Sequence, residues 1–491
     1  SPTLIRSSTR STRTTLTRPA PMPGADVAQR SAPSLAVPGN RWSRLARLGG
    51  LASGIAGGML AEGARQFAQG KRPRMGDLLL TPANARRVAD QLAQLRGAAM
   101  KVGQLLSMDA GDLLPPELGD ILARLRSDAH PMPMSQLVTV LESQWGSGWE
   151  RHFERFSFTP MAAASIGQVH AAHTRDGRHL AIKVQYPGVR QSIDSDVDNV
   201  ATLLRVSGLL PKSLDIGPLL QEAKQQLHGE ADYLSEGAWL QRYGALLQDT
   251  REFTLPELHG DLSTASILAM SHVGGAPIES VIGLPQAERD RVATLLFTLL
   301  FREIFEFKLI QTDPNFANYR YDSTSRRLIL LDFGATRSYA PEMVDAYRQL
   351  FSGGIAHDRA AMNMAAMAIG YFQADIRDQQ RDTVLEIFSL ACEPLRHQGT
   401  YDFGNSDLAA RIHKAGMVLG RDREFWHTPP AAALFLHRKL GGLYLLAARL
   451  KARVDVARLA QSFLRENETG RAPLRHARNK KGEPHGLAWP G

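Results

Sequence analysis

Residues 161–188 read MAAASIGQVHAAHTRDGRHLAIKVQYPG. Two runs that are rich in β-forming residues flank a turn at Asp176-Gly177, so this stretch predicts an antiparallel hairpin. The layout is typical of a hairpin that holds the phosphates of a nucleotide, with Lys183 on its second strand. Hairpins of that kind open on glycines, whereas this one opens on alanines.

The loop at the start of the hairpin departs from the glycine pattern G-x-G-x-x-G-x-V. Ala162 and Ala164 stand where that pattern has its first two glycines, and Gly167 stands at the third. Because a β-carbon hinders positive φ and keeps the backbone away from a phosphate, we expect a stiffer loop that binds a nucleotide but does not support fast transfer to a protein. The residues expected to contact the nucleotide in this hairpin are Ala162, Ala163, Ala164, Ser165, Gly167, Val169 and Lys183.

Four polar residues supply the groups that phosphoryl transfer needs. That chemistry requires a lysine for the phosphates, oxygen ligands for Mg²⁺ and a carboxylate near the transferred group. Lys183 in AIK, Asp313 and Asn318 in QTDPNFANY, and Asp332 in LILLDFG follow the order found in kinases. Each residue alone has an ordinary explanation as a turn former, a cap or a strand residue. Because all four occur together, we interpret Lys183 and Asp313 as catalytic, and Asn318 and Asp332 as metal ligands.

The hydrophobic periodicity divides the chain into helical and strand-rich parts. Residues 80–145 and about 190–248 show helical spacing, and the chain is again mostly helical after Gly274-Gly275. The short β-rich runs are residues 165–186, 253–259, 266–273 and a small hairpin at 318–334. This order predicts an α+β fold of two lobes, one with a small antiparallel sheet and one mainly helical. The expected divisions are a disordered basic tail (1–40), a helical extension (41–150), a sheet lobe (151–276), a helical lobe (277–465) and a second basic tail (466–491).

The composition narrows the class of protein. With 491 residues, 43% hydrophobic and 22% charged, the chain is typical of a globular protein. Cys392 is the only cysteine, which excludes a disulfide framework and a cysteine metal cluster. The net charge of +9 suits an anionic membrane face or a nucleotide. Nucleic acid is not expected as a partner, because the basic residues concentrate in a tail without interleaved aromatics.

The N-terminal region combines arginines with a glycine pattern. Residues 1–61 hold eight arginines and one acid, and the first 40 read as a disordered tail or an organelle transit peptide. The apolar run 48–61 is shorter than the ~20 residues that span a bilayer. Gly50, Gly54 and Gly58 recur every fourth residue, which predicts a shallow membrane contact, a homodimer contact or a flexible linker.

An ordered set of motifs resembles the UbiB family of protein-kinase-like proteins and, within it, the AarF domain-containing branch with the mitochondrial coenzyme Q ATPases. The set covers roughly residues 41–340. Its members are AAMKVGQLLSM, LLPPEL, AAASIGQVH, AIKVQYPGV, GEADY, QTDPNFANY and LLDFG.

The resemblance implies a lid and a lysine partner that spacing alone did not select. Lys101 and Gln104 match the family's K-x-G-Q signature, on a helical extension that folds over the cleft and reaches the nucleotide. Glu230 and Asp232 match its E-x-D motif, with Glu230 as the partner of the catalytic lysine. Glu222 and Glu236 lie on the same predicted helix as Glu230, and any of the three is otherwise a solvated helix residue.

Two departures from ordinary kinases argue against a peptide substrate. Gln311-Thr312 replaces the His-Arg that precedes the catalytic aspartate, as in this branch of the family. Ala340-Pro341-Glu342 follows Asp332 after only eight residues, which leaves no room for an activation loop.

We therefore expect an ATP- or ADP-binding, Mg²⁺-dependent atypical kinase or ATPase. The resemblance implies a role in ubiquinone synthesis, with quinone-biosynthesis proteins and anionic lipid as partners. The alternatives are a small-molecule or lipid kinase, or a nucleotide-dependent scaffold with negligible catalysis. The expected location is the bacterial cytoplasm at the inner membrane or, alternatively, the matrix side of the mitochondrial inner membrane.

Overall fold

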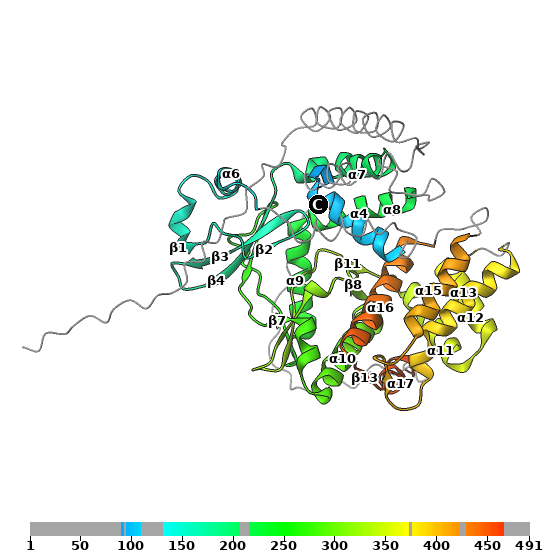
Figure 1. Ribbon diagram of the computed structural model, residues 1–491. Coiled ribbons are helices and arrows are strands. Elements are labelled where there is room, and N and C mark those ends of the chain that lie inside the picture. The colour runs from blue at the N-terminus through cyan, green and yellow to red at the C-terminus, as the bar shows by residue number, and fades with distance from the viewer. Residues whose placement is uncertain are drawn as a thin grey trace, which may run out of the picture.

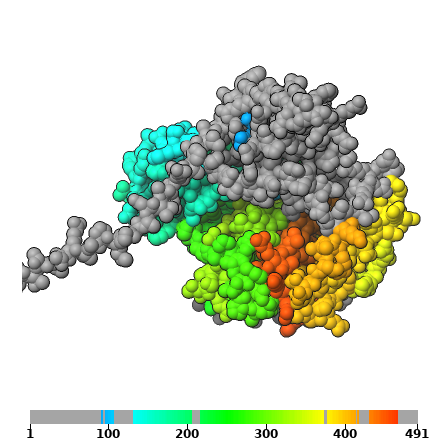
Figure 2. Space-filling model, in the orientation of Figure 1, coloured from blue at the N-terminus to red at the C-terminus, as the bar shows by residue number. Residues whose placement is uncertain are grey.

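The computed structural model describes residues 90–92, 95–109, 131–206, 216–372, 376–421 and 429–465. These residues form an antiparallel sheet lobe and a larger, mainly helical lobe (Figure 1), as the sequence predicts. The sheet lobe, in cyan, and the helical lobe, from green to red, occupy different parts of the surface (Figure 2). Both basic tails, the glycine-patterned segment and residues 110–130 lie outside the described part of the chain. The division between the lobes at residue 276 stays a prediction.

The sheet lobe is built around the predicted hairpin. β3 (Gly167–Thr174) and β4 (His179–Gln185) pair antiparallel from Gly167 opposite Gln185 to His173 opposite His179. Gly177 makes the turn with φ of 88°, a conformation that glycine adopts without steric cost. The sheet order is β1-β3-β4-β6, and β2 pairs with β3. The other strands are β1 (Phe153–Phe156), β2 (Ala162–Ala163) and β6 (Ile267–Ser271).

Two short helices complete the core on one face of this sheet. α6 (Met134–Trp145) and the 3₁₀ turn η2 (Trp149–His152) share a hydrophobic cluster with β1, β4 and β6. Trp149 is fully buried in this cluster, where its ring lies edge-on to Phe153. Central strand β4, which carries Lys183, is thereby fixed between its neighbours and a packed aromatic layer.

The helical stretch expected at 190–248 is several helices rather than one. They are α7 (Val189–Val206), α8 (Gly217–Glu230) and α9 (Tyr233–Leu247). Asp232 ends the continuity by capping α9, because its carboxylate accepts a hydrogen bond from Ser235 N at 3.1 Å. α4 (Arg96–Asp109) packs against α7 and α8, so this part of the expected helical extension lies on these helices, whereas α6 of the same expected extension packs on the sheet.

A second sheet joins the two lobes. Its order is β5-β10-β9-β7, with strands β5 (Phe253–Thr254), β7 (Ala276–Pro277), β9 (Tyr319–Asp322) and β10 (Arg327–Leu330). β9 and β10 form the predicted hairpin. β5 pairs with β10 in parallel although it precedes β6 of the first sheet in sequence. Gly275, with φ of 83°, turns the chain into β7, where a β-carbon would lie 2.6 Å from Ile329 Cδ1.

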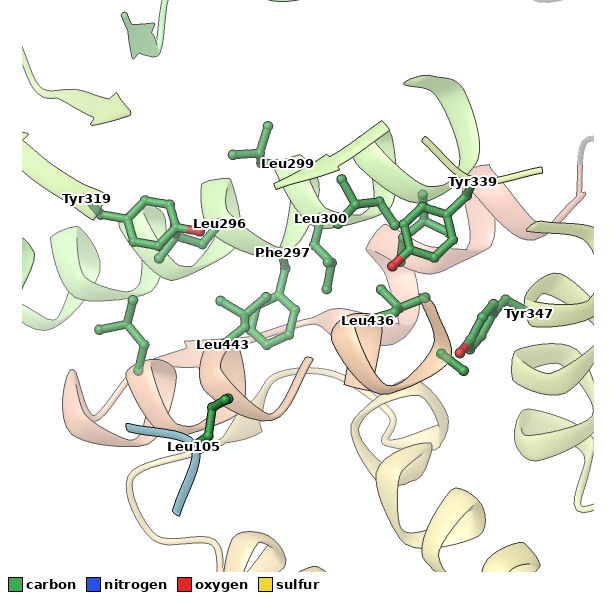
Figure 3. Close-up of a cluster of buried hydrophobic side chains, with 14 of the residues drawn as sticks. Leu105, Leu296, Phe297, Leu299, Leu300, Tyr319, Tyr339, Tyr347, Leu436 and Leu443 are labelled. Carbon is green, nitrogen blue, oxygen red and sulfur yellow. The ribbon is translucent and has the colours of Figure 1, made fainter. Parts of the chain in front are cut away.

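The helical lobe is centred on α10 (Gln286–Phe301) and α16 (Ala431–Arg449), which lie side by side (Figure 1). Leu296 and Phe297 of α10 and Leu436 and Leu443 of α16 belong to one buried cluster, which also includes Tyr319 (Figure 3). The remaining elements are η3 (Ile278–Gly283), the π-helical turn η4 (Arg302–Phe307), β8 (Leu309–Gln311), η5 (Phe316–Asn318), β11 (Thr336–Ser338), α11 (Pro341–Ala356), α12 (Arg359–Ile369), α13 (Asp378–Ala391), α14 (Glu393–Arg396), β12 (Tyr401–Asp402), α15 (Leu408–Arg421), β13 (Arg453–Val454) and α17 (Val456–Leu464).

The segment after Asp332 is short and ordered. β11 pairs antiparallel with β8 a few residues after the aspartate, and α11 then begins at Pro341, the proline of the Ala340-Pro341-Glu342 triplet. This connection leaves no extended loop at the position of a kinase activation loop. In the part of the chain that the structure describes, no helix is both long and apolar enough to cross a bilayer.

Candidate active site

Lys183 joins three separate elements at the boundary of the two lobes. It lies on β4, and its Nζ is 3.0 Å and 2.9 Å from the two carboxylate oxygens of Glu236 on α9. The same Nζ is 3.3 Å from Asp332 Oδ2, which follows β10. Lys183 and Glu236 are buried, whereas a third of the Asp332 side chain is exposed. The structure therefore brings Lys183 and Asp332 together across 149 positions, as the sequence predicts.

The charges of this cluster support one another. Burial by itself lowers the pKa of Lys183, but Asp332 and Glu236 outweigh burial and raise the pKa well above its ordinary value. Burial raises the pKa of Asp332, but Lys183 and a hydrogen bond from Gly334 N hold it below its ordinary value. Burial raises the pKa of Glu236 to about 7 although Lys183 opposes the shift. The two carboxylates thus favour the charged form of Lys183, and Asp332 is the more exposed of them.

The pairing of Glu230 with Lys183 is wrong. Glu230 forms an ion pair with Lys101 of α4 and accepts a hydrogen bond from the Ser165 hydroxyl. The reason is the break after α8: Glu230 is the last residue of that helix, and Glu236 lies in the first turns of α9, on the side that meets β4. The capping residue Asp232 between them was the available signal that the two glutamates belong to different helices.

Lys101 links the helical extension to the centre of the site. Burial lowers its pKa, but the carboxylates of Glu230, Asp313 and Asp332 outweigh burial and raise it. Gln104, one turn further along α4, is half-buried. α4 also contacts the loop at the start of the hairpin, residues 161–169, which we call the alanine loop. A β-carbon at Gly97 would lie 2.4 Å from the carbonyl oxygen of Ser165 in this loop. The lysine of the K-x-G-Q motif therefore sits among the acidic groups of the candidate site.

Asp232, the second acid of the E-x-D motif, has a local structural role. Besides the bond from Ser235 N, it accepts one from the Ser235 hydroxyl at 2.8 Å. Burial raises the pKa of Asp232, but these two hydrogen bonds bring it below its ordinary value. Its contribution to the site is to start α9 at the position that brings Glu236 to Lys183.

Asp313 and Asn318 lie on one short segment between β8 and β9. Asn318 Nδ2 donates to Asp313 Oδ2 at 3.0 Å, and Asn315 N donates to Asp313 Oδ1 at 3.3 Å. Leu331 N donates to the carbonyl of Asn318 at 3.1 Å, which ties this segment to the residue before Asp332. Asn318 thus directly precedes β9, and Asp332 follows the neighbouring strand β10.

The alanine loop is a regular strand end. Ala162 pairs with Val169 and Ala163 with Gln168, and Ala164 N donates to the carbonyl of Gly167 at 2.9 Å. No residue between 161 and 169 has a positive φ, so the alanines meet no backbone strain. Ala162 and Ala163 are exposed. The start of the loop therefore lies on the surface at the end of the sheet.

Gly167 is required by packing, whatever it contacts in a bound nucleotide. A β-carbon there would lie 2.3 Å from the carbonyl oxygen of Val184 and 3.0 Å from Tyr233 Oη. Tyr233 also places its ring 5.1 Å from Lys183 Nζ. The glycine therefore lets β3 and the start of α9 pack closely around Lys183. From the sequence alone, the only role expected for Gly167 was contact with the nucleotide.

The two lobes, the lysine clamped by two carboxylates at their boundary and the Asp-x-x-x-x-Asn segment define a protein-kinase-like protein. The family model described as "ABC1 atypical kinase-like domain" matches residues 124–366 of this chain. The chain is 38% identical over 427 residues to the mitochondrial atypical kinase COQ8B of Rattus norvegicus, which covers 87% of this chain and 80% of that protein. It is 36% identical over 429 residues to the mitochondrial atypical kinase COQ8 of Saccharomyces cerevisiae, and the match covers 87% of this chain and 85% of that protein. The chain therefore belongs to the family of ABC1 atypical kinases.

A solved structure confirms the fold. The complex of Rv3197 with erythromycin from Mycobacterium tuberculosis has a TM-score of 0.53 with this chain and 24% sequence identity, and the match covers 78% of this chain and 95% of that one. The predicted family, the kinase-like α+β fold and the class of phosphoryl-transfer enzyme are confirmed.

Proposed function

We propose that the protein binds ATP with Mg²⁺ in the site between its lobes and hydrolyses it or transfers its phosphate to a small acceptor, in support of ubiquinone synthesis. The observation that carries this proposal is the contact of Lys183 with both Glu236 and Asp332. A buried ammonium that faces a partly exposed carboxylate is the arrangement that phosphates and a metal require from a protein.

Lys183 would contact the phosphates, and Glu236 rather than Glu230 would hold it in place. The residues at Ala162–Val169 form the strand edge above these groups, and Ser165 connects that edge to Glu230. No alanine of the edge needs a special φ, so the alanines fit this backbone without strain. This supports nucleotide binding by the hairpin.

Asp332 and Asn318 fit a magnesium ion in the chemistry of their donors. The amide nitrogen of Asn318 is engaged by Asp313, which leaves its carbonyl oxygen as a ligand beside the partly exposed Asp332. Bound there, Mg²⁺ would neutralise charge on the phosphates.

Asp313 would orient the attacking water or hydroxyl group. Two donors fix its carboxylate, Asn315 N and Asn318 Nδ2, so its direction is set before a substrate binds. Lys101 lies near both Asp313 and Asp332, and its ion pair with Glu230 keeps α4 over the site. That cover, with the short segment after Asp332, supports water or a small acceptor rather than a peptide.

The role in ubiquinone synthesis rests on membership of the family and on the resemblance to coenzyme Q ATPases. Both named relatives are mitochondrial, which supports the matrix side of the inner membrane over the bacterial cytoplasm. Contact with anionic lipid, with other proteins of quinone synthesis and with a second copy through Gly50, Gly54 and Gly58 belongs to the same proposal.

The test is ATP hydrolysis by the purified full chain with anionic liposomes and Mg²⁺, beside Asp332→Asn. Exposed Asp249→Asn is the matched control. Because Asp332→Asn loses one preorganised charge, we expect its turnover to be about a hundredfold lower than that of the parent. The turnover of Asp249→Asn should equal that of the parent. Equal turnover in all three proteins would contradict the proposed site. With γ-labelled ATP, label in the lipid extract instead of free phosphate would favour a lipid kinase. Quinone synthesis rescued in cells by Asp313→Asn would favour a scaffold.

A further inference from the structure

A third buried lysine, besides Lys101 and Lys183, lies beneath the segment that carries Asp313. Lys439 of α16 is 5% exposed, and its Nζ donates to Gln311 Oε1 at 3.1 Å and to Tyr319 Oη at 2.5 Å. Its acidic neighbour is Glu303, whose Oε2 lies 3.9 Å from Nζ. These partners are more than 100 positions away in sequence, so no motif pointed to this network.

The network is costly to bury. Glu303 is 1% exposed, and its Oε1 accepts from Tyr243 Oη at 2.7 Å, while Oε2 makes no hydrogen bond with any described residue. Glu303 lies on the π-helical turn η4, a rare conformation that often occurs at functional sites. Buried ion pairs are weak stabilisers compared with apolar side chains of the same size. Stability alone is therefore a poor explanation for Lys439.

The partners of Lys439 stand at both ends of the catalytic segment. Gln311 is the last residue of β8, two positions before Asp313, and Tyr319 is the first residue of β9, directly after Asn318. One ammonium group thus holds the entry and the exit of residues 312–318 at a common point. A displacement of either end changes where Asp313 and Asn318 lie.

The same helix supports the middle of the segment through a glycine. Gly442 follows Lys439 by almost one turn of α16, and a β-carbon there would lie 2.5 Å from Cβ of Pro314. Pro314 is the residue after Asp313. Lys439, Gly442 and Pro314 line one small cavity together with Glu303 and Tyr319. α16 therefore touches the segment at its start, its middle and its end.

We propose that Lys439 is a positioning residue for catalysis, which holds the Asp313–Asn318 segment from below, with Gly442 allowing α16 to come close enough. This rests on the proposed function, in which Asp313 orients the attacking group. Lys439 touches neither the acceptor nor the phosphates. Its removal loosens the geometry of turnover and leaves nucleotide binding by the Lys183 cluster intact.

The first experiment separates positioning from stability. Lys439→Met alone leaves Glu303 as an unpaired buried charge, so the informative protein is the double variant Lys439→Met/Glu303→Gln, which is neutral at both positions. We expect a thermal midpoint near that of the parent, a nucleotide Kd within about twofold, and a kcat lower by about 10- to 100-fold, the size known for small misplacements. A double variant with the parent's kcat overturns the proposal.

The second experiment uses two adjacent glycines as a matched pair. In Gly442→Ala the new β-carbon would clash with Cβ of Pro314. Gly441 is exposed, and the β-carbon of Gly441→Ala would have no atom within 4 Å. We expect Gly442→Ala to lower kcat about tenfold with little change in KM for ATP, and Gly441→Ala to leave both unchanged. Equal kcat in the two variants contradicts the role given to Gly442.

Hydrogen exchange provides a readout that does not depend on turnover. In Lys439→Met/Glu303→Gln, amides of residues 312–318 should exchange faster, while those of β4 keep the parent rate. If the parent itself hydrolyses no ATP, the proposed function fails and this measurement still decides the inference. Unchanged exchange in the segment overturns it in either case.

Discussion

Two of the buried lysines, Lys183 and Lys439, each lie beside a buried glutamate and differ in what they face. Lys183 Nζ is within 3.0 Å of both Glu236 oxygens and also reaches the partly exposed Asp332. Lys439 Nζ lies 3.9 Å from Glu303, and its hydrogen bonds go to an amide and a phenol. The first lysine contacts two carboxylates directly, whereas the second donates its hydrogen bonds to neutral groups and has one carboxylate at a greater distance. The comparison shows that burial of a lysine does not define its role, and that its partners do.

The largest expected effect concerns the glutamate of the first lysine. Glu236→Gln removes one of the two charges that hold Lys183, so we expect nucleotide Kd to rise about tenfold or more. Glu230→Gln is the matched control, because Glu230 pairs with Lys101 and not with Lys183. Isothermal titration with ATP and Mg²⁺ measures both. The comparison fails if Glu230→Gln weakens binding more than Glu236→Gln does.

The next effect concerns the close packing around Lys183. Gly167→Ala places a β-carbon 2.3 Å from the carbonyl of Val184, which predicts a loss of about 1–3 kcal/mol in the free energy of unfolding. Gly244→Ala on α9 meets nothing within 4 Å and, as a helix substitution, should stabilise by about 0.5–1 kcal/mol. Denaturant unfolding of the two variants checks this. If Gly167→Ala is as stable as the parent but binds nucleotide more weakly, the packing explanation is wrong and Gly167 is needed for contact with a phosphate.

The smallest effect is a pH dependence on the helix of the second lysine. Burial lowers the pKa of His437 on α16 to about 4, and its ring contacts Tyr371 Oη. Because the folded pKa lies below the ordinary 6.5, neutral His437 contributes stability above pH 6.5, and that contribution is lost as the pH falls through 4. Glu236, with its raised pKa, acts in the opposite direction.

The measurement is the difference in unfolding free energy between the parent and His437→Gln at several pH values, which cancels the contribution of Glu236. The parent's advantage should shrink by roughly 1–2 kcal/mol between pH 6.5 and 4. A difference that stays constant over this range would show that the histidine titrates normally in the folded protein.

The sequence predicted the parts of the site that short patterns encode. The β3–β4 hairpin, the β9–β10 hairpin and the approach of Lys183 to Asp332 followed from turn residues, β-rich runs and the order of the polar groups. Helical spacing could not show where the stretch 190–248 breaks, because all its parts have the same period. The capping contact of Asp232 with Ser235 decides the break and thereby which glutamate meets Lys183.

Other features depend on contacts between distant parts of the chain. No pattern near Lys439 in the sequence predicts its hydrogen bond to Gln311, 128 positions away. Likewise, the carbonyl that leaves no room for a β-carbon at Gly167 lies on another strand. Single-residue patterns carry no information on such approaches, since they arise only when helices and strands are packed. The structure was therefore needed to find the support beneath the segment, whereas the order of the polar residues in the sequence already singled out Asp313 and Asn318 as candidates.

The strand β5 has a consequence for any attempt to divide the protein. It contributes Phe253 and Thr254 to the sheet of the helical lobe, alongside Leu328 and Ile329 of β10, before the chain returns to the first sheet as β6. A fragment that starts at residue 277 would leave β10 as a bare sheet edge, with apolar Leu328 and Ile329 beside unpaired backbone groups, which favours aggregation. Because β5 belongs to the second sheet while the next strand, β6, belongs to the first, we expect the two lobes to unfold together as one cooperative unit.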